Sequence, residues 1–314
     1  MQRIHEFYGH GKLLLTGEYF VLDGATALAI PTRAGQRFTV GPLWGDLRYD
    51  LEWIIDDNTD EPRRELFFLR EEWHSAAQPP RDPVRARLLQ LLRAAEQLRL
   101  GCTEALYQKK VTSRLEFPPD WGLGSSSTLV YFLGRLLDVN PYKLLELSFG
   151  GSGYDLACAG AAQPLLYRRM GHYPEVKSVS WNPAWVRKTY FVHLNRKQNS
   201  REGIAAYRNV ETSPRTLGQI TQLTLALVNA PDLRTAARIL TDHEKIVAST
   251  LELQPVKERL FRDFPGTVKS LGAWGGDFVW ALSELAAEKV QAYFNERGYG
   301  TVIPFNEMIW PSDE

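Results

Sequence analysis

The stretch that decides how this sequence is interpreted is Pro119-Asp120-Trp121-Gly122-Leu123-Gly124-Ser125-Ser126-Ser127. Its glycines let the backbone come close to a ligand, and its three hydroxyls stand at the start of an apolar helix that we expect to begin near Ser127. Free backbone N–H groups at a helix N-terminus favour anions, and a serine hydroxyl there can also bind magnesium. The stretch therefore predicts a phosphate-binding loop, and the alternative is an ordinary loop with a serine N-cap.

Three other segments combine glycines with ionisable side chains. They are Gly11-Lys12 through Gly17-Glu18-Tyr19, Gly150-Gly151-Ser152-Gly153-Tyr154-Asp155, and Lys269-Ser270-Leu271-Gly272-Ala273-Trp274-Gly275-Gly276-Asp277. Asp155 on its glycine turn suits a carboxylate that is presented into a cleft. Each segment also has a purely structural alternative: Asp155 can cap a helix, Lys12 can be a solvated lysine at a strand start, and Asp277 can be a turn residue.

Composition and charge exclude several classes of protein. The chain has 314 residues, of which 44% are hydrophobic, so disorder is excluded as the main state. Its 37 Lys and Arg balance its 37 Asp and Glu, so no global positive field favours nucleic acid or acidic membranes. No run approaches the roughly 20 apolar residues that cross a bilayer, and no signal peptide is evident, so we expect a cytoplasmic protein. Cys102 and Cys158 are expected to be buried thiols.

Hydrophobic periodicity and turn residues predict a mixture of strands and helices. Period-2 alternation predicts a strand over 47–55 with a return strand over 66–69, and Asp82-Pro83 predicts the start of an amphipathic helix that Gly101 closes. Hairpin strands beside helices indicate an α+β protein, with domains over 1–180 and 181–314. Further strands are expected over 111–117, 190–194, 278–282 and 301–305, and further helices over 127–137, after Asn140-Pro141, and over 217–229, 233–253 and 283–297.

The glycine motifs match neither the P-loop nor the dinucleotide-binding spacing. In this order and at these separations they resemble those of the GHMP kinase superfamily, which includes galactokinase, homoserine kinase, mevalonate kinase and phosphomevalonate kinase. Residues 11–24 look like the first motif of the family, 119–127 like the second and 269–277 like the third. Trp274 stands where the family usually has glycine. The resemblance implies a two-domain fold, with an N-terminal ribosomal-protein-like domain, a C-terminal ferredoxin-like domain and the active site between them.

The resemblance also implies roles for residues of the motifs. ATP would be bound by the second and third motifs, through Gly122, Leu123, Gly124, Ser125, Ser126, Ser127, Gly272, Gly275 and Gly276. Lys12 would neutralise charge on the transferred phosphoryl group, and Asp155 would face the acceptor. Magnesium would be bound through one serine, for which we choose Ser126, and through Glu146, whose alternative is a solvated position on a helix surface.

Two details resemble the phosphomevalonate kinase branch in particular: the Gly-Ser-Gly-aromatic-Asp segment that ends at Asp155, and the aspartate that closes the third motif, Asp277. A basic loop over 195–201 could hold the phosphate of such an acceptor, or could be an ordinary solvated loop. The predicted acceptor-binding residues are Glu18, Tyr19, Lys197, Ser200, Arg201 and Asp277.

The sequence thus predicts an ATP- and magnesium-dependent kinase, with phosphomevalonate favoured as acceptor and mevalonate next. A decarboxylase resembling diphosphomevalonate decarboxylase is an alternative within the same fold. A non-catalytic binding or regulatory protein is a second alternative, which Trp274 favours if its ring blocks a ligand. The expected partners are ATP and a small-molecule acceptor, without nucleic acid or membrane, and a homodimer is allowed.

Overall fold

The computed structural model describes residues 4–44, 48–74, 80–171, 173–196, 200–274 and 276–310; of Ser200 and Arg201 it describes the backbone alone. Contacts divide the chain into two compact units. The first comprises Met1–Gly11, Ala34–Pro119 and Gly124–Gly160, and the second Lys12–Arg33, Asp120–Leu123 and Ala161–Glu314. Each of these units combines several segments of the chain, so they do not test a single boundary in the sequence. The domains 1–180 and 181–314 therefore stay a prediction.

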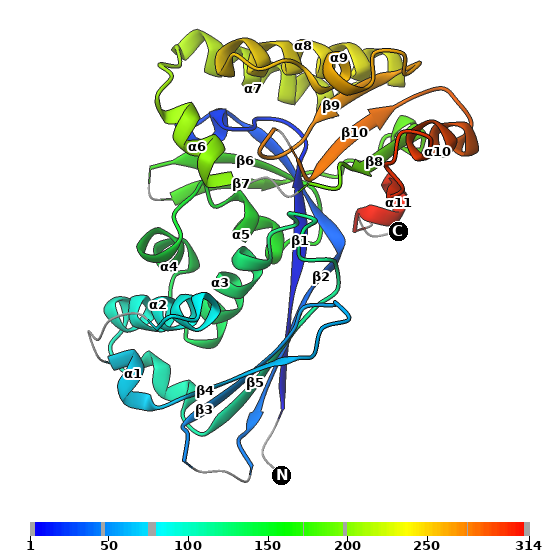
Figure 1. Ribbon diagram of the computed structural model, residues 1–314. Coiled ribbons are helices and arrows are strands. Elements are labelled where there is room, and N and C mark those ends of the chain that lie inside the picture. Colours follow the sequence, from blue (N-terminus) through cyan, green and yellow to red (C-terminus); the bar gives the residue numbers. More distant parts are fainter. Residues whose placement is uncertain are drawn as a thin grey trace. The chain divides into compact units, whose positions relative to one another are not determined.

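The first unit is built on a mixed sheet with helices on one face (Figure 1). Its strands have the order β4-β3-β5-β2, β1 pairs with β2, and β3 runs parallel to β5. The strands are β1 (His5–Leu14), β2 (Ala27–Pro42), β3 (Leu51–Asp56), β4 (Arg64–Phe68) and β5 (Lys109–Leu115), of which β1 and β2 continue into the second unit. The helices are α1 (Arg70–His74), α2 (Pro83–Leu98), α3 (Ser125–Leu136), α4 (Pro141–Ser148), α5 (Tyr154–Ala159) and the 3-10 helix Cys102–Leu106.

An aromatic core holds these helices on the sheet. The ring of Phe132 on α3 stacks on that of Phe38 on β2, with 4.2 Å between the centroids, and the edge of Trp53 on β3 meets it. The Trp53 indole donates to the Ser113 hydroxyl over 3.2 Å, so its one polar atom is satisfied in the core. Burying such rings contributes about 2–3 kcal/mol each. This packing fixes the direction of α3 and therefore of its N-terminus.

The second unit contains a four-stranded sheet of order β11-β8-β10-β9, and the start of β2 pairs there with the β6–β7 hairpin. The strands are β6 (Leu165–Met170), β7 (Tyr173–Ser178), β8 (Thr189–His193), β9 (Thr267–Ser270), β10 (Phe278–Leu282) and β11 (Val302–Pro304). The helices are α6 (Ser200–Arg208), α7 (Pro214–Val228), α8 (Leu233–Leu251), α9 (Val256–Leu260), α10 (Ala287–Asn295) and α11 (Phe305–Met308), with 3-10 helices Phe20–Asp23 and Ala184–Lys188.

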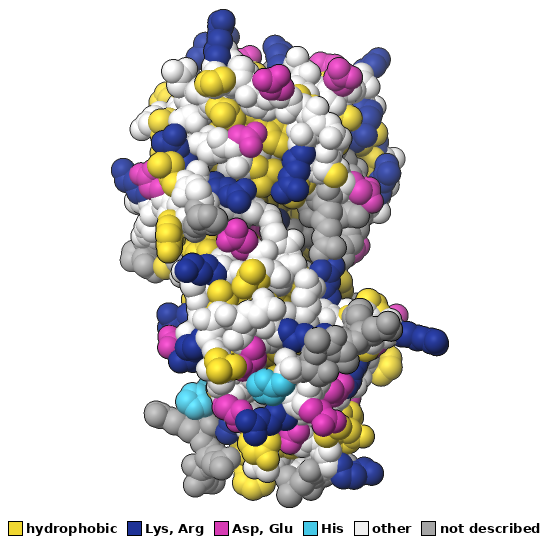
Figure 2. Space-filling view, turned by 90° about the vertical axis from the view of Figure 1, so that its left-hand side faces the viewer, with side chains coloured by type: hydrophobic (Ala, Val, Ile, Leu, Met, Phe, Trp, Pro, Cys, Tyr) yellow, Lys and Arg dark blue, Asp and Glu magenta, His cyan; other side chains and the backbone are white. Residues whose placement is uncertain are grey.

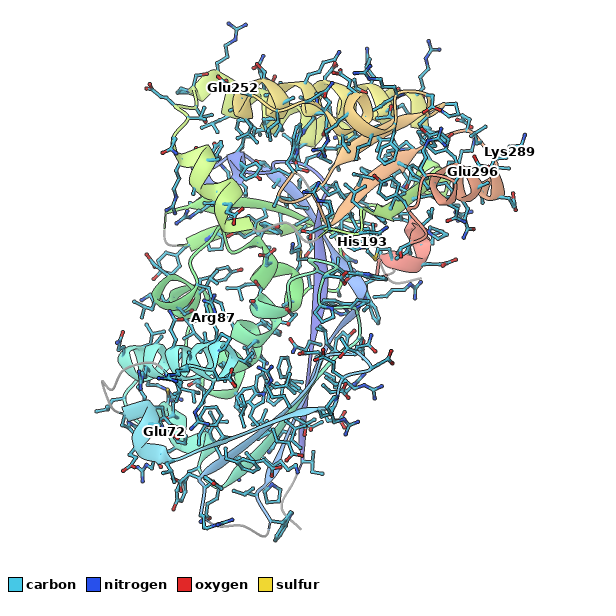
Figure 3. All side chains as sticks on the ribbon, in the orientation of Figure 1. Glu72, Arg87, His193, Glu252, Lys289 and Glu296 are labelled. Atoms are coloured by element: carbon cyan, nitrogen blue, oxygen red, sulfur yellow. The ribbon has the colours of Figure 1, made fainter. Side chains whose placement is uncertain are left out.

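Both faces of the four-stranded sheet are buried, as the uninterrupted apolar run of β10 requires. On one face Val192 and Val279 pack with Phe294 of α10. On the other face the ring of Phe191 stacks on those of Trp280 and Phe305. Figure 3 shows Lys289 of α10 pointing away from the sheet, and Glu296 directly after the end of that helix.

Most predicted elements are present, and the predicted α+β class is confirmed. The Asp82 carboxylate accepts backbone N–H groups at the start of α2, as the Asp-Pro pair indicated. The Asn140 amide oxygen does the same at the start of α4, as the Asn-Pro pair indicated. Leu47, the first residue of the predicted strand 47–55, lies outside the described residues. Among the described residues, no helix combines the length and the apolar character that a membrane span requires. The cytoplasmic location and the homodimer stay predictions.

Three helix starts were predicted wrongly. The helix expected over 217–229 begins at Pro214, where the Ser213 side chain caps it. The helix expected from Ser127 begins at Ser125, because Gly124 takes the left-handed conformation at its N-cap and its carbonyl accepts from the Ser127 and Thr128 amides. The helix expected over 283–297 covers Ala287–Asn295. Ser283 instead belongs to the turn after β10, since its hydroxyl donates to the Pro265 carbonyl and accepts from the Leu285 amide.

Candidate active site

Lys12, from the first glycine motif, is held against the loop of the second motif. Lys12 and residues 120–123 of that loop lie in the second unit. The Lys12 amide donates to the Leu123 carbonyl over 3.0 Å, and its Nζ donates to the Gly122 carbonyl over 3.0 Å. Lys12 is half-buried near the end of β1, so it is not the solvated lysine at a strand start that was the alternative. Its ammonium group is fixed beside the backbone of the glycine loop.

Asp277, which closes the third motif, lies against the same glycine. A Cβ atom on Gly122 would come within 2.4 Å of the Asp277 Oδ2 atom, and Gly122 has a φ of 65°. Both features require glycine at position 122. The Asp277 amide donates to the Arg196 carbonyl, and its own carbonyl accepts from Leu194. The three motifs, which are far apart in sequence, therefore meet around Gly122.

The start of the second motif rests on the four-stranded sheet. His193 and Phe278 are cross-strand partners on β8 and β10, and the edge of the Trp121 ring contacts Phe278 with 5.4 Å between centroids. The His193 Nε2 atom lies 3.3 Å from the Asp120 carbonyl. Figure 3 shows His193 at the end of β8. This packing anchors the loop before its glycines, so that Gly122 and Leu123 are presented to Lys12.

The three serines of the second motif form the first turn of α3, in the first unit. Gly124 is the N-cap, with a φ of 94°, and within the described residues no side chain caps this helix. The amides of the first turn are therefore available to an anion. Ser126 is exposed, Ser125 is half-buried and Ser127 is buried.

Asp155 stands in the first turn of α5, two residues after Gly153, which has a φ of 86°. Gly153 is the N-cap of this helix, so Asp155 is not the capping residue that was the alternative. The Ser127 hydroxyl donates to the Asp155 Oδ2 atom over 3.5 Å, a long hydrogen bond. Asp155 is half-buried. The structure thus brings together a carboxylate and the hydroxyl of a serine of the second motif, both in the first unit.

Glu18 and Tyr19 were predicted to bind the acceptor, and the structure gives both side chains partners inside the second unit. Glu18 is fully buried in an ion pair with Lys269, and its Oε2 atom lies 3.6 Å from the His243 Nε2 atom. Burial raises the pKa of the Glu18 carboxyl above its usual range. The Tyr19 ring stacks on that of Tyr207, at 5.7 Å.

Trp274, the bulky residue of the third motif, is accommodated in the core of the second unit. Its side chain is 7% exposed and belongs to a buried cluster with Tyr19 and Tyr207. The backbone of Trp274 has a φ of 49°, a conformation that glycine adopts without strain. Gly272 also has a positive φ, Gly276 is buried, and Gly275 lies outside the described residues. The loop keeps a glycine-like backbone while the indole ring packs into the core.

The remaining predicted residues are less well defined. Glu146 is exposed on α4. Among the described residues, no group of three or more His, Cys, Asp or Glu side chains could hold a metal ion, so Ser126 and Glu146 stay predictions as magnesium ligands. Lys197 lies outside the described residues, as do the side chains of Ser200 and Arg201, whose backbone begins α6.

The sequence analysis did not identify His243 and Glu244 as candidate residues, and it included Lys269 in the third motif without assigning it a role. All three are buried beside Glu18. A signal was present: on α8, His243 follows Ala236, Ile239 and Leu240 at helical spacing, which places it on the apolar face. Around the exposed surface, by contrast, charges of both signs are interspersed, as Figure 2 shows for one face, in agreement with the balanced charge of the sequence.

Comparisons with known proteins show similarity at the level of the fold. No family model and no curated protein matches the sequence. Among solved structures, a Lin0012 protein from Listeria innocua matches with a TM-score of 0.71 and 14% identity, over 96% of this chain and 97% of that one. Streptococcus pneumoniae phosphomevalonate kinase, in complex with phosphomevalonate and AMPPNP, matches with a TM-score of 0.68 and 17% identity, over 96% and 98%.

Mevalonate kinase from L. major, in complex with R-mevalonate, matches with a TM-score of 0.65 and 16% identity, over 100% of this chain and 98% of that one. The structural neighbours are GHMP kinases. The fold is therefore the two-domain GHMP kinase fold that the glycine motifs indicated. At these identities the likeness extends to the fold alone.

Proposed function

We propose that this protein is an ATP-dependent kinase that transfers the γ-phosphoryl group of ATP to a small-molecule acceptor. The observation that carries the proposal is the meeting of the three glycine motifs at Gly122, where Lys12 donates to the carbonyl and Asp277 leaves no room for a side chain. A cation fixed beside a glycine loop suits a transferred phosphoryl group. The fold likeness to kinases supports the same activity.

The residues present fit ATP and magnesium. The uncapped first turn of α3 offers backbone N–H groups to the β- and γ-phosphates, and the hydroxyls of Ser125 and Ser126 are accessible beside them. Magnesium takes oxygen ligands and keeps several waters, so a serine hydroxyl and one carboxylate suffice on the protein side. When bound, magnesium neutralises charge on the phosphate oxygens.

Lys12 and Asp155 have distinct roles in the proposed reaction. Lys12 stabilises the negative charge that develops on the transferred group, from a position that its bond to Gly122 fixes in advance. If the acceptor is a hydroxyl, Asp155 accepts its proton, a contribution of about 10²- to 10⁴-fold. If the acceptor is a phosphate, its second pKa of about 6 leaves the attacking oxygen anionic at neutral pH, so no base is needed. The role of Asp155 is then to orient the reacting groups.

Phosphomevalonate is the favoured acceptor and mevalonate the next. The support is the Gly-Ser-Gly-Tyr-Asp segment, the terminal Asp277, and the basic loop that adjoins it, since Asp277 donates to the Arg196 carbonyl. The alternative of a non-catalytic protein loses support. It required the Trp274 ring to block a ligand, whereas this ring is packed in the core with Tyr19 and Tyr207.

ADP release by the purified protein tests the proposal. ATP and magnesium are supplied with mevalonate, phosphomevalonate, a panel of sugars, homoserine, or no acceptor. We expect turnover with phosphomevalonate. Turnover with mevalonate alone would keep the kinase and reject the preferred acceptor, and carbon dioxide released in step with ADP would indicate the decarboxylase. If no acceptor supports turnover and ATP does not bind, the kinase proposal is wrong.

The basic loop can be tested separately with Lys197→Ala and Arg201→Ala. If these cations bind the phosphate of the acceptor, each variant raises the KM for phosphomevalonate by about 10-fold or more, as the loss of a charged hydrogen bond implies. The KM for ATP serves as the internal control. Unchanged kinetics in both variants would remove the loop from the acceptor site.

A further inference from the structure

Four ionisable side chains are buried together in the second unit, away from solvent. Glu18 and Lys269 are fully buried, His243 is fully buried, and Glu244 is 4% exposed. They come from three segments that are far apart in sequence: the turn after β1, the middle of α8, and β9. Charged side chains are rarely buried unless paired, and burying an ion pair gives little net stability. Such a cluster therefore calls for an explanation other than stability.

The contacts of these residues join two loops that carry the glycine motifs. The Gly17 amide donates to the His243 Nε2 atom over 2.9 Å. The Ser270 amide and hydroxyl donate to Glu244 Oε1, over 3.2 and 2.9 Å. Because His243 and Glu244 are consecutive on α8, one helix binds the first-motif turn and the strand before the third-motif loop.

Glu18 and Lys269 connect the same two segments directly. Lys269 Nζ is ion-paired with Glu18 and also donates to the Ser270 carbonyl over 2.8 Å. The contacts thus close a ring that runs through residues 17, 18, 269, 270, 244 and 243. The third-motif loop begins at Leu271 and ends at Asp277, which contacts Gly122. A displacement of β9 would therefore move the loop that Asp277 belongs to.

We infer that Glu18, Lys269, His243 and Glu244 form a buried clamp that holds the first and third motif loops in register, and that Glu18 is a positioning residue which does not touch the acceptor. The inference rests on the proposed function. Its basis is that Glu18 has no exposed surface and that its carboxylate is paired with Lys269. An acceptor could reach Glu18 only if the side chains that bury it moved apart.

Three variants test the clamp: Glu18→Gln, Lys269→Met and the double variant. Each single change leaves one buried charge without its partner, so the Tm falls by about 6 °C or more. The double variant removes both charges of this ion pair and regains part of that loss, since Glu244 still loses the nearby charge of Lys269. Its kcat nevertheless stays about 10-fold or more below wild type, because the link between the loops is absent, while the KM for the acceptor changes less than about 3-fold.

The matched control is the exposed pair Lys188 and Glu284 of the same unit, whose side chains are 54% and 69% exposed. Lys188→Met with Glu284→Gln leaves Tm and kcat within error, since exposed pairs contribute little. Two results would overturn the inference. Full recovery of kcat in the Glu18/Lys269 double variant would mean that the pair is structural only. A raised KM for the acceptor in Glu18→Gln but not in Lys269→Met would mean that Glu18 binds the acceptor.

Amide hydrogen exchange supplies a readout that does not depend on turnover. In the Glu18/Lys269 double variant we expect the amides of Gly17 and Ser270 to exchange about 10-fold faster or more than in wild type, with no change in the surface control. Unchanged exchange at both amides would reject the clamp. If the wild-type protein releases no ADP with any acceptor, the proposed function fails, and the exchange result still decides on the clamp.

Discussion

The turns that carry Asp155 and Glu18 differ in how firmly they hold their carboxylates. Asp155 follows Gly153, is half-buried, and accepts from Ser127 over a long 3.5 Å distance. Glu18 follows Gly17, is fully buried and is ion-paired with Lys269. Sequence motifs predicted that both would face the acceptor. The structure shows the first carboxylate half-buried and the second fully buried in an ion pair.

This difference is a guide to function. A carboxylate that must take a proton or turn toward a substrate cannot also be committed to strong internal partners, whereas one that positions a loop gains from them. We therefore expect substitutions at Asp155 to affect chemistry without affecting stability, and substitutions around Glu18 to affect both.

The largest effect is expected for Asp155→Asn. With a hydroxyl acceptor, kcat should fall by at least about 10²-fold, because the amide cannot accept the proton, and nucleotide affinity should change little. Steady-state kinetics with ATP and acceptor varied in turn provide the measurement. The control is Asp138→Asn in the same unit, whose side chain is 88% exposed. Unchanged turnover in Asp155→Asn would eliminate the role as base and, with it, the contrast with Glu18.

Glu244→Gln tests the buried cluster around Glu18 through the pH dependence of the free energy of unfolding. Burial raises the pKa of Glu244 to about 7. A folded-state pKa above the unfolded value of about 4.3 gives stability that is present at low pH and lost as the pH rises through 7. The difference in unfolding free energy between wild type and Glu244→Gln should therefore fall by up to about 3 kcal/mol from pH 4.5 to 7.5.

The neighbours of Glu244 have opposing influences. Lys269 lowers the pKa of Glu244 and Glu18 raises it, while burial lowers the pKa of His243 well below its usual value. His243 is present in both proteins, so its titration cancels in the comparison. Denaturant unfolding at a series of pH values gives the result, and a difference independent of pH would contradict it.

Gly122→Ala tests whether Asp277 and the glycine loop need their close contact. The new methyl group would lie 2.4 Å from the Asp277 carboxylate, so we expect a loss of about 1–3 kcal/mol in stability and about 10-fold in kcat. Gly101→Ala is a matched control, since Gly101 also has a positive φ but its Cβ would meet no described atom within 4 Å. It should cost only about 1 kcal/mol, the backbone strain. Equal losses would show that the contact is unimportant.

The smallest effect is expected for Glu252→Gly. Glu252 ends α8 in the left-handed conformation, with a φ of 53°, and Figure 3 shows it at the end of that helix. Glycine adopts this conformation without strain and should raise the stability by about 0.5 kcal/mol. Thermal unfolding measures the gain. Because this change stabilises α8 without touching His243 or Glu244, kcat should stay constant; a changed kcat would show that α8 affects activity by another route.

Local signals in the sequence predicted much of the fold. The caps at Asp82 and Asn140 were found because their chemistry lies within three residues of the helix start. Strand β2 was not found: its first six residues are all buried, so they show no alternation, and Pro31 reads as a break. The glycine motifs predicted the fold of the whole chain, whereas the contact of Lys12 with the Gly122 carbonyl was found only in the structure.

What the sequence could not predict depends on long-range contacts. An isolated Glu or Lys is normally solvated, so nothing in the residues around Glu18 or Lys269 signals a buried pair 251 positions apart. Trp274 looked like an obstacle because a motif carries no information about where a side chain points. Its ring packs with Tyr207 of α6, a helix that no sequence pattern had predicted.

The closed ring of contacts around Glu18 has a consequence for exchanging segments between proteins of this fold. A chimera that receives strand β9 and the third-motif loop of another protein would also receive the residue that stands at position 269, and would keep Glu18, His243 and Glu244 from this chain. A mismatch would leave a charge buried without its counter-ion. We therefore expect the third-motif loop to be transferable between such proteins only when the residues at positions 18, 243, 244 and 269 are transferred with it.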